Sequence, residues 1–150
     1  MLRGTRKPLI VMTPKSLLRH KRCVSTLDDL ALGSSFHRVL WEAPPSDADR
    51  AVERVILCSG KIYYDLLQAR EDLWLDGKVA LIRLEELAPF PEEVLETELR
   101  RYPKAARFVW CQEEPRNMGA FYYIRPRLEE LSNHKLRYSG RERSSSPAAG

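Results

Sequence analysis

The first residues with a recognisable chemical use are Ser59-Gly60-Lys61, a polar turn directly after the apolar run Val55–Cys58. A turn that opens a helix presents backbone N–H groups, and a lysine adds a positive charge, so the combination suits an anion. A complete phosphate loop would need a glycine at Val55 and a hydroxyl residue at Ile62, so that motif is excluded. A structural alternative stays open, in which Ser59 caps the helix that follows.

A second polar segment, Gln112–Asn117, follows the apolar run Phe108–Cys111. The adjacent carboxylates Glu113 and Glu114 point apart in an extended chain, so they do not suit a catalytic pair. Ion pairs are the use that we expect for them, with three candidate partners: Arg83, Arg107 and Arg116. Gln112 is the better candidate for a specific hydrogen bond. Gln112 also follows a predicted strand, as Ser59, Gly60 and Lys61 do, and we include it with them as a candidate for part of an anion-binding surface.

The histidines and cysteines of the sequence supply no further catalytic centre. The three histidines have no metal-binding spacing and no nucleophile motif beside them. Three cysteines, an odd number at wide spacing, predict no disulfide framework and fit a reducing compartment. Cys58 and Cys111 lie in apolar runs, where a buried thiol acts as a small apolar side chain. The chain alone is therefore not expected to be a complete catalyst.

Alternating strands and helices must position these residues. Apolar runs predict strands at 9–12, 36–41, 55–58, 79–84, 108–111 and 136–138. Helical spacing predicts helices at 61–74, after Pro91, and over about residues 119–131, where Pro126 should kink or shorten the helix. Residues 42–53 are expected to form a loop and residues 142–150 a flexible tail.

This order of elements predicts an α/β fold with a mostly parallel sheet that is covered on both faces. Ligands of such sheets bind at the carboxyl ends of the strands. Three polar turns fall at those ends, at residues 59–61, 85–86 and 112–117. We therefore expect the three turns to gather at one edge of the sheet.

The charge of the chain is concentrated at one end. The 150 residues include 25 Lys+Arg and 21 Asp+Glu, a net charge of +4. Residues 1–22 hold seven basic residues and no acid, which leaves a net charge of −3 for the rest. A nucleic-acid-binding domain would spread positive charge over its fold, so that class is not favoured. No apolar run approaches the length of a membrane span, and the chain length predicts a single domain.

Several longer motifs resemble one known family, the C-terminal domain of 2-oxoglutarate dehydrogenases. The matching segments are residues 6–20, 58–66, 83–91, 110–115, 117–119, 137–141 and 146–150. They follow one another in the family's order over essentially the whole chain, and residues 42–53 and 67–78 carry no clear signature. The resemblance implies a three-layer α/β sandwich like the C-terminal domain of transketolases. It also implies that residues 1–150 are a fragment of a longer enzyme, truncated at both ends.

The resemblance implies a function that belongs to the longer enzyme. Such enzymes decarboxylate 2-oxoglutarate on thiamine diphosphate and Mg²⁺, held by upstream domains, and pass the succinyl group to lipoyl groups of a succinyltransferase component. They work in the bacterial cytoplasm or the mitochondrial matrix. The domain packs on the catalytic domains and supports the homodimer, and in some members it lines a regulatory site for acetyl-CoA or another nucleotide such as AMP. Residues 1–22 would enter from the catalytic neighbours, and Lys15 and Arg19 would join Lys61 at the anion site.

Two other functions fit the sequence. The first is the same domain of a 2-oxoadipate dehydrogenase, although Cys111 and the pair Tyr63-Tyr64 favour 2-oxoglutarate. The second is a free-standing module that binds nucleotides or a partner subunit. An upstream reading frame that encodes thiamine-binding domains would exclude this second function.

Overall fold

The computed structural model describes residue 4, residues 7–41 and residues 46–146. The chain divides into two units, residues 1–34 and residues 35–150, and each is considered by itself. In the first unit, the described residues form two short 3₁₀ helices, Lys15–Arg19 and Asp28–Leu30. Neither helix contains a buried residue.

The prediction of a strand at Leu9–Met12 is wrong. These four residues have no regular secondary structure, and their side chains are 68–91% exposed. An apolar run forms a strand only where another strand accepts and donates its backbone hydrogen bonds. None of the strands in the described part of the chain pairs with it.

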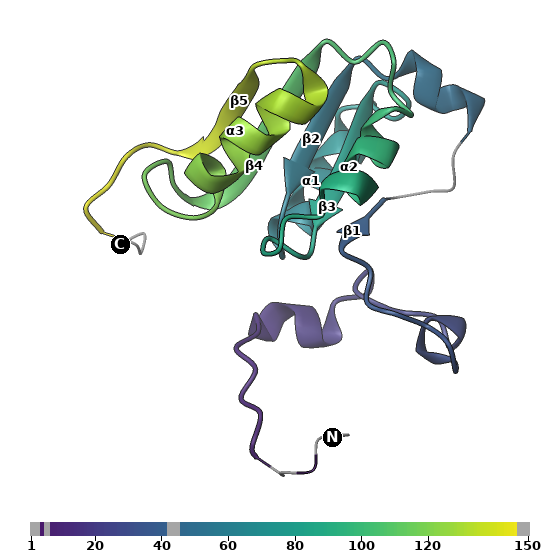
Figure 1. Cartoon of the computed structure of the whole chain (residues 1–150), viewed down its shortest axis with the longest axis vertical. Coiled ribbons are helices and arrows are strands. Elements are labelled where there is room, and N and C mark those ends of the chain that lie inside the picture. Colours follow the sequence, from purple (N-terminus) through teal and green to yellow (C-terminus); the bar gives the residue numbers. More distant parts are fainter. Residues whose placement is uncertain (1–3, 5–6, 42–45, 147–150) are drawn as a thin grey trace. The chain divides into compact units, whose positions relative to one another are not determined.

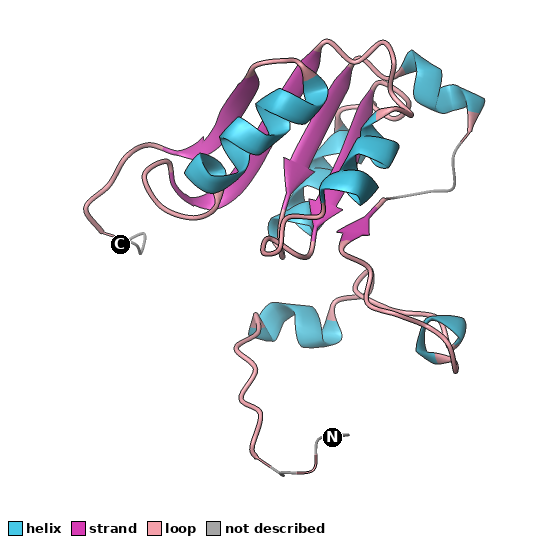
Figure 2. Ribbon diagram, in the orientation of Figure 1, coloured by secondary structure: helices cyan, strands magenta, loops and turns pink. Residues whose placement is uncertain are grey.

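The second unit contains the predicted α/β fold (Figure 2). Its described strands are β1 (Val39–Leu40), β2 (Arg54–Cys58), β3 (Val79–Leu84), β4 (Arg107–Pro115) and β5 (Leu136–Arg141). Its α-helices are α1 (Ile62–Asp72), α2 (Glu92–Leu99) and α3 (Phe121–Ser132). The sheet order is β1-β3-β2-β4-β5, with β1 antiparallel and the other strands parallel. The mostly parallel sheet is thus confirmed.

Helices cover both faces of this sheet, which gives three layers (Figure 1). On one face, α2 and α3 lie side by side, and Leu95 and Phe121 join a core with Leu57 and Trp110. On the other face, Tyr63 of α1 packs in a second core that includes Cys58 and Leu81. Consecutive residues of one strand pack into opposite cores because their side chains alternate between the two faces of the sheet.

The strand order places a topological switch between β2 and β4. The chain leaves β2 through α1 to reach β3 on one side, whereas β4 and β5 lie on the other side of β2. In open parallel sheets, the crevice at such a switch point, beyond the carboxyl ends of the strands, is the usual place for a ligand. The turn after Cys58 and the end of β4 are therefore the parts of the fold to examine for a site.

Several element boundaries differ from the prediction. The strand expected at 36–41 is reduced to Val39–Leu40, and β5 continues to Arg141. Residues 112–115 are part of β4 rather than a turn, because β5 pairs with β4 as far as Pro115 through an irregular register. Pro126 does not end α3, which continues to Ser132. Pro126 is exposed, so water can reach the carbonyl group that loses its N–H donor.

A buried charge cluster joins α2 to a 3₁₀ helix, Asp47–Ala51, within the segment that was predicted to be a loop. Arg101 donates hydrogen bonds to Asp49 at 2.9 Å and to Glu98 at 2.7 Å. The side chains of Arg101 and Glu98 are only 11% and 6% exposed. The hydroxyl of Tyr102 also donates to Glu98, and burial raises the pKa of Tyr102, which keeps this donor protonated. The predicted loop residues 42–45 lie outside the described part.

Candidate functional site

The structure brings Lys61 and Glu113 together at the carboxyl ends of β2 and β4. The Lys61 ammonium donates to a carboxylate oxygen of Glu113, and the two side chains are 39% and 43% exposed. This hydrogen bond raises the pKa of Lys61, so the ammonium stays charged. The partners predicted for Glu113 were Arg83, Arg107 and Arg116, and that prediction is wrong. Arg83 instead stacks over the ring of Tyr63, with its guanidinium carbon 4.1 Å from the ring centre.

The turn before α1 leaves space in front of Lys61. Gly60 has a φ of +77°, which favours glycine, and a Cβ atom at this position would meet nothing within 4 Å. Lys61 occupies the N-cap position of α1, and no side chain caps the helix. The capping role considered for Ser59 is therefore not observed. The backbone N–H groups of Tyr63 and Tyr64 already donate to the carbonyl oxygens of Gly60 and Lys61, at 3.4 and 3.1 Å, so among the first helical residues the N–H group of Ile62 is the one left for water or an anion.

Gln112 is a buried hydrogen-bond centre between β4 and α3. Its Oε1 accepts from the indole Nε1 of Trp110 at 2.8 Å and from the backbone N–H of Phe121 at 3.1 Å. Its Nε2 donates to the carbonyl oxygens of Pro115 at 3.2 Å and Met118 at 2.8 Å. Gln112 is 4% exposed, so its amide serves the protein interior.

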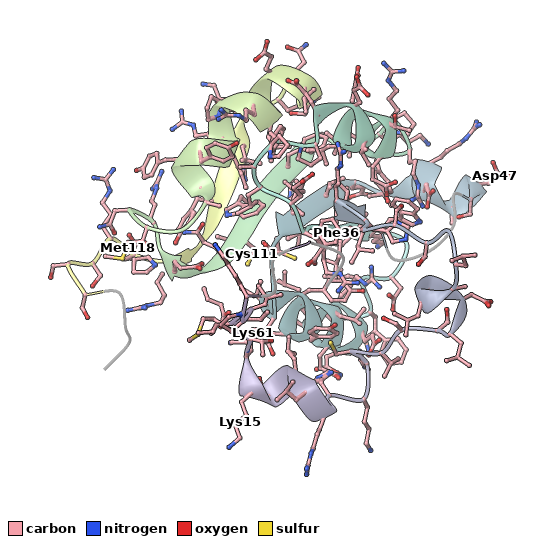
Figure 3. The ribbon with its side chains drawn as sticks, turned by 60° about the horizontal axis from the view of Figure 1, so that its bottom comes forward. Lys15, Phe36, Asp47, Lys61, Cys111 and Met118 are labelled. Atoms are coloured by element: carbon pink, nitrogen blue, oxygen red, sulfur yellow. The ribbon has the colours of Figure 1, made fainter. Side chains whose placement is uncertain are left out.

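Gln112 and Lys61 therefore do not converge on one point, although the sequence places both near the same edge. Gln112 and Glu113 are neighbours in β4, and their side chains point to opposite faces. Glu113 reaches Lys61 at the start of α1, whereas Gln112 reaches the start of α3. Figure 3 labels Lys61 at the start of α1, Cys111 on β4 and Met118 in the loop before α3.

The backbone of Gly119 lies against the side-chain amide of Gln112 and fixes its position. A Cβ atom on Gly119 would lie 2.9 Å from both polar atoms of the Gln112 amide, so only glycine fits beside it. Asn117, in the same loop, exchanges two hydrogen bonds with the backbone of Ser144, at 2.9 and 3.0 Å. Residues 142–146 were predicted to belong to a flexible tail, but these bonds attach Ser144 to the loop. The rest of that prediction, residues 147–150, lies outside the described part.

The remaining predicted residues have structural partners or belong to the other unit of the chain. Glu86 forms an ion pair with Arg38 at 3.2 Å, which anchors the segment before β1 to the end of β3. Lys15 and Arg19 are exposed on the first 3₁₀ helix, in the other unit of the chain. Their predicted part in the anion site stays a prediction.

The cysteines of the second unit are buried, as the sequence predicted, whereas Cys23 is exposed. Burial raises the pKa of the Cys111 thiol, against an opposing effect of its hydrogen bond with Ser139, so the thiolate is disfavoured.

The described residues contain no group of three or more His, Cys, Asp or Glu side chains that could hold a metal ion. No helix in the described ranges is long and apolar enough to cross a membrane.

One signal in the sequence predicts the split between Gln112 and Glu113. If Trp110 faces the core, alternation places Gln112 on the same face and Glu113 on the other. Alternation alone does not identify Lys61 as the partner of Glu113, because the two residues are 52 positions apart in the sequence. Nothing in the sequence indicates the bonds between Asn117 and Ser144, which are 27 residues apart.

The sequence matches the family model described as 2-oxoglutarate dehydrogenase C-terminal over residues 24–150. Matching relatives include the 2-oxoglutarate dehydrogenase E1 components of Brucella anthropi, at 50% identity, and of Brucella abortus strain S19 and Brucella ovis, at 49% each. Each match covers 100% of this chain and 16% of the relative. The chain is therefore similar to one part of much longer proteins.

Proposed function

Because the chain belongs to the 2-oxoglutarate dehydrogenase C-terminal family, we propose that it forms the C-terminal part of a 2-oxoglutarate dehydrogenase E1 component. The parent enzyme would decarboxylate 2-oxoglutarate and pass the succinyl group to lipoyl groups of the succinyltransferase component. Thiamine diphosphate and Mg²⁺ would be held by its upstream domains, and the enzyme would be a homodimer. The Brucella relatives favour the bacterial cytoplasm over the mitochondrial matrix as its compartment.

The observation that carries this proposal is the apolar surface of the first unit. Nine apolar side chains between residues 9 and 32 are at least 68% exposed: Leu9, Ile10, Val11, Met12, Leu18, Val24, Leu27, Leu30 and Leu32. Four of them, Leu9–Met12, are consecutive, and exposed apolar surface of this extent marks a protein interface. Packing of the first unit on the catalytic domains of the parent would remove these side chains from water.

Complementation tests this proposal. The E1 component of Brucella anthropi would be prepared without the part that matches this chain, and the 150-residue chain would be added separately. With thiamine diphosphate, Mg²⁺ and 2-oxoglutarate, we expect no decarboxylation by either piece and measurable decarboxylation by the mixture. The double variant Leu27→Asp/Leu30→Asp should abolish the complementation, since it places charges in the proposed interface.

A matched control is Ser25→Asp/Ser34→Asp, which adds the same charge to exposed polar positions of the same unit. This control should retain complementation. Turnover by the isolated chain, or equal complementation by both double variants, would contradict the proposed role.

The second part of the proposed function is a regulatory anion site at Lys61, with Ser59 and Gly60 in the turn beside it. Its support is the uncapped start of α1, the open space at Gly60 and the charged ammonium of Lys61. The ligands with the required charge in this family are acetyl-CoA and AMP. Because Glu113 already contacts Lys61, an incoming phosphate group must displace the Glu113 carboxylate.

This competition predicts opposite effects for two variants of the parent enzyme. Lys61→Ala should weaken binding of acetyl-CoA or AMP about tenfold or more, the loss expected for one charged hydrogen bond. Glu113→Gln should strengthen binding, because it removes the competing carboxylate. Isothermal titration calorimetry measures both, with Lys78→Ala as the control, since Lys78 lies before β3 at the opposite edge of the sheet. Equal affinities for the wild type and Lys61→Ala would remove Lys61 from the site.

A further inference from the structure

The carboxyl-terminal part of the chain carries excess positive charge of its own. Residues 116–146 contain seven Lys/Arg and three Asp/Glu, whereas residues 23–115 have a net charge of −7. The body of the protein therefore has a basic part and an acidic part, although its total charge is close to neutral. The basic part comprises the loop before α3, α3 itself, β5 and the segment that follows.

Three arginines of this region contact aromatic residues rather than carboxylates, either through the ring or through a tyrosine hydroxyl group. The guanidinium carbon of Arg127 lies 4.0 Å from the centre of the Tyr123 ring. Arg116 lies over the rings of Phe121, at 5.7 Å, and Tyr138, at 5.5 Å.

Arg143 donates to the hydroxyl of Tyr122 at 2.8 Å. Within the described ranges, no carboxylate lies at ion-pair distance from any of the three arginines. Their positive charge is therefore not neutralised by a neighbouring side chain.

The buried ring of Phe121 links the Arg116 contact to the Arg143 contact, whereas Arg127 stacks on Tyr123, the next residue of α3 after Tyr122. The ring of Phe121 contacts that of Tyr122 at 5.3 Å and that of Tyr138 at 5.0 Å, between centres. Tyr122 and Tyr123 are 45% and 37% exposed. We use the name arginine–tyrosine surface for five residues: Arg116, Tyr122, Tyr123, Arg127 and Arg143.

We propose that the arginine–tyrosine surface docks an acidic segment of a partner protein. Arginine presents a planar fork of N–H groups that pairs with a carboxylate through two hydrogen bonds, and arginine and tyrosine are enriched at the centres of protein interfaces. Stacking on the rings restricts the rotamers of the arginines before the partner arrives, which lowers the entropy lost on binding. This role is independent of the enzyme assembly and of the Lys61 site proposed above.

The spacing of the arginines favours an extended acidic segment over a single small anion. Arg127 stacks on Tyr123, Arg116 lies over Phe121 and Tyr138, and Arg143 donates to Tyr122, so the three guanidinium groups have no aromatic partner in common. A phosphate ion binds where several donors converge on one point, but carboxylates along a peptide can meet donors that lie apart.

Fluorescence anisotropy with a fluorescein-labelled decaglutamate peptide tests the proposal on the 150-residue chain. The triple variant Arg116→Gln/Arg127→Gln/Arg143→Gln should weaken binding by about tenfold or more. The triple variant Lys78→Gln/Lys104→Gln/Arg107→Gln removes the same charge from exposed positions elsewhere and should weaken it less than threefold, an effect of about the size expected for general charge alone.

A third variant, Arg116→Lys/Arg127→Lys/Arg143→Lys, keeps the charge but removes the planar forks. It should bind more weakly than the wild type and more tightly than the glutamine variant. Circular dichroism confirms that each variant is folded. Equal weakening by the two glutamine variants would overturn the proposal, because it would show attraction by net charge alone. Displacement of the peptide by inorganic phosphate at the peptide's own concentration would also overturn it, since the surface would then be a small-anion site.

Discussion

Gln112→Leu should lower the free energy of unfolding by about 3–4 kcal/mol, because the substitution leaves several buried polar groups without partners. The indole N–H of Trp110, the backbone N–H of Phe121 and the carbonyl oxygen of Met118 each lose a hydrogen bond to the Gln112 amide. For a chain of this size, the expected drop in Tm is on the order of 10 °C. Urea unfolding followed by far-ultraviolet circular dichroism measures the change.

Gln68→Leu is the matched control for that experiment. Gln68 is exposed on α1, and its amide donates one hydrogen bond to Asp72 at 2.9 Å. The same replacement there should change the free energy of unfolding by less than about 0.5 kcal/mol. A similar loss of stability in both variants would show that leucine lowers the free energy of unfolding for a reason other than the loss of the buried amide. It would refute the role assigned to Gln112.

The second large effect is expected at Arg101, in the cluster that joins α2 to the helix Asp47–Ala51. Arg101→Met should lower the free energy of unfolding by about 3–5 kcal/mol, because it leaves the carboxylates of Glu98 and Asp49 without their cation. The Glu98 side chain is 6% exposed and that of Asp49 is 17% exposed, so water compensates little of this loss. The double variant Arg101→Met/Glu98→Gln should recover part of the stability.

The neighbouring residue Arg100 provides the control. Arg100 pairs with Glu96 at 2.7 Å, but the two side chains are 74% and 47% exposed. Surface ion pairs of this kind contribute about 0–1 kcal/mol, so Arg100→Met should have a small effect. If thermal unfolding showed equal losses for the two arginine variants, burial of the Arg101 cluster would not be what determines its contribution.

The strands and helices of the second unit follow from local pattern. The apolar run at 79–84 predicts β3 with its observed limits, and the spacing of Ile62 and Leu66 predicts α1 to within two residues at either end. These elements are buried on one or both faces of a three-layer fold, so the alternation of apolar and polar residues determines where they lie. The parallel sheet then follows from the alternation of strands and helices.

The failures have a common physical cause, which is that pairing partners lie far away in the sequence. Leu9–Met12 has the composition of a strand but pairs with none of the strands among the described residues. Gln112–Pro115 has the composition of a turn, yet it is strand, because β5 pairs with it from more than 20 residues further along the chain. Polar residues there tolerate burial because the start of α3 satisfies the Gln112 amide.

The predicted site also depends on residues that are far apart in the sequence. Sequence placed Lys61 and Gln112 at one edge, and the strand order supports that edge, because β2 and β4 are parallel neighbours. The pleat of β4 determines which of its side chains faces Lys61. In the structure this side chain is Glu113. Local pattern therefore identifies the edge of the sheet, whereas the pleat and the pairing determine which groups meet there.

The bonds between Asn117 and Ser144 bear on the order in which the protein is made. A ribosome releases the chain from its amino end, so β2, β3 and β4 emerge before β5 and Ser144. Until then the loop that supplies the Met118 carbonyl to Gln112 lacks its attachment, and β4 has an open edge on the side where β5 will pair. An open strand edge is a template for wrong pairing. Residues made after β2, β3 and β4 thus close the sheet and attach the loop before α3, so a nascent chain stopped before Leu136 would expose the open edge of β4 and be prone to aggregation.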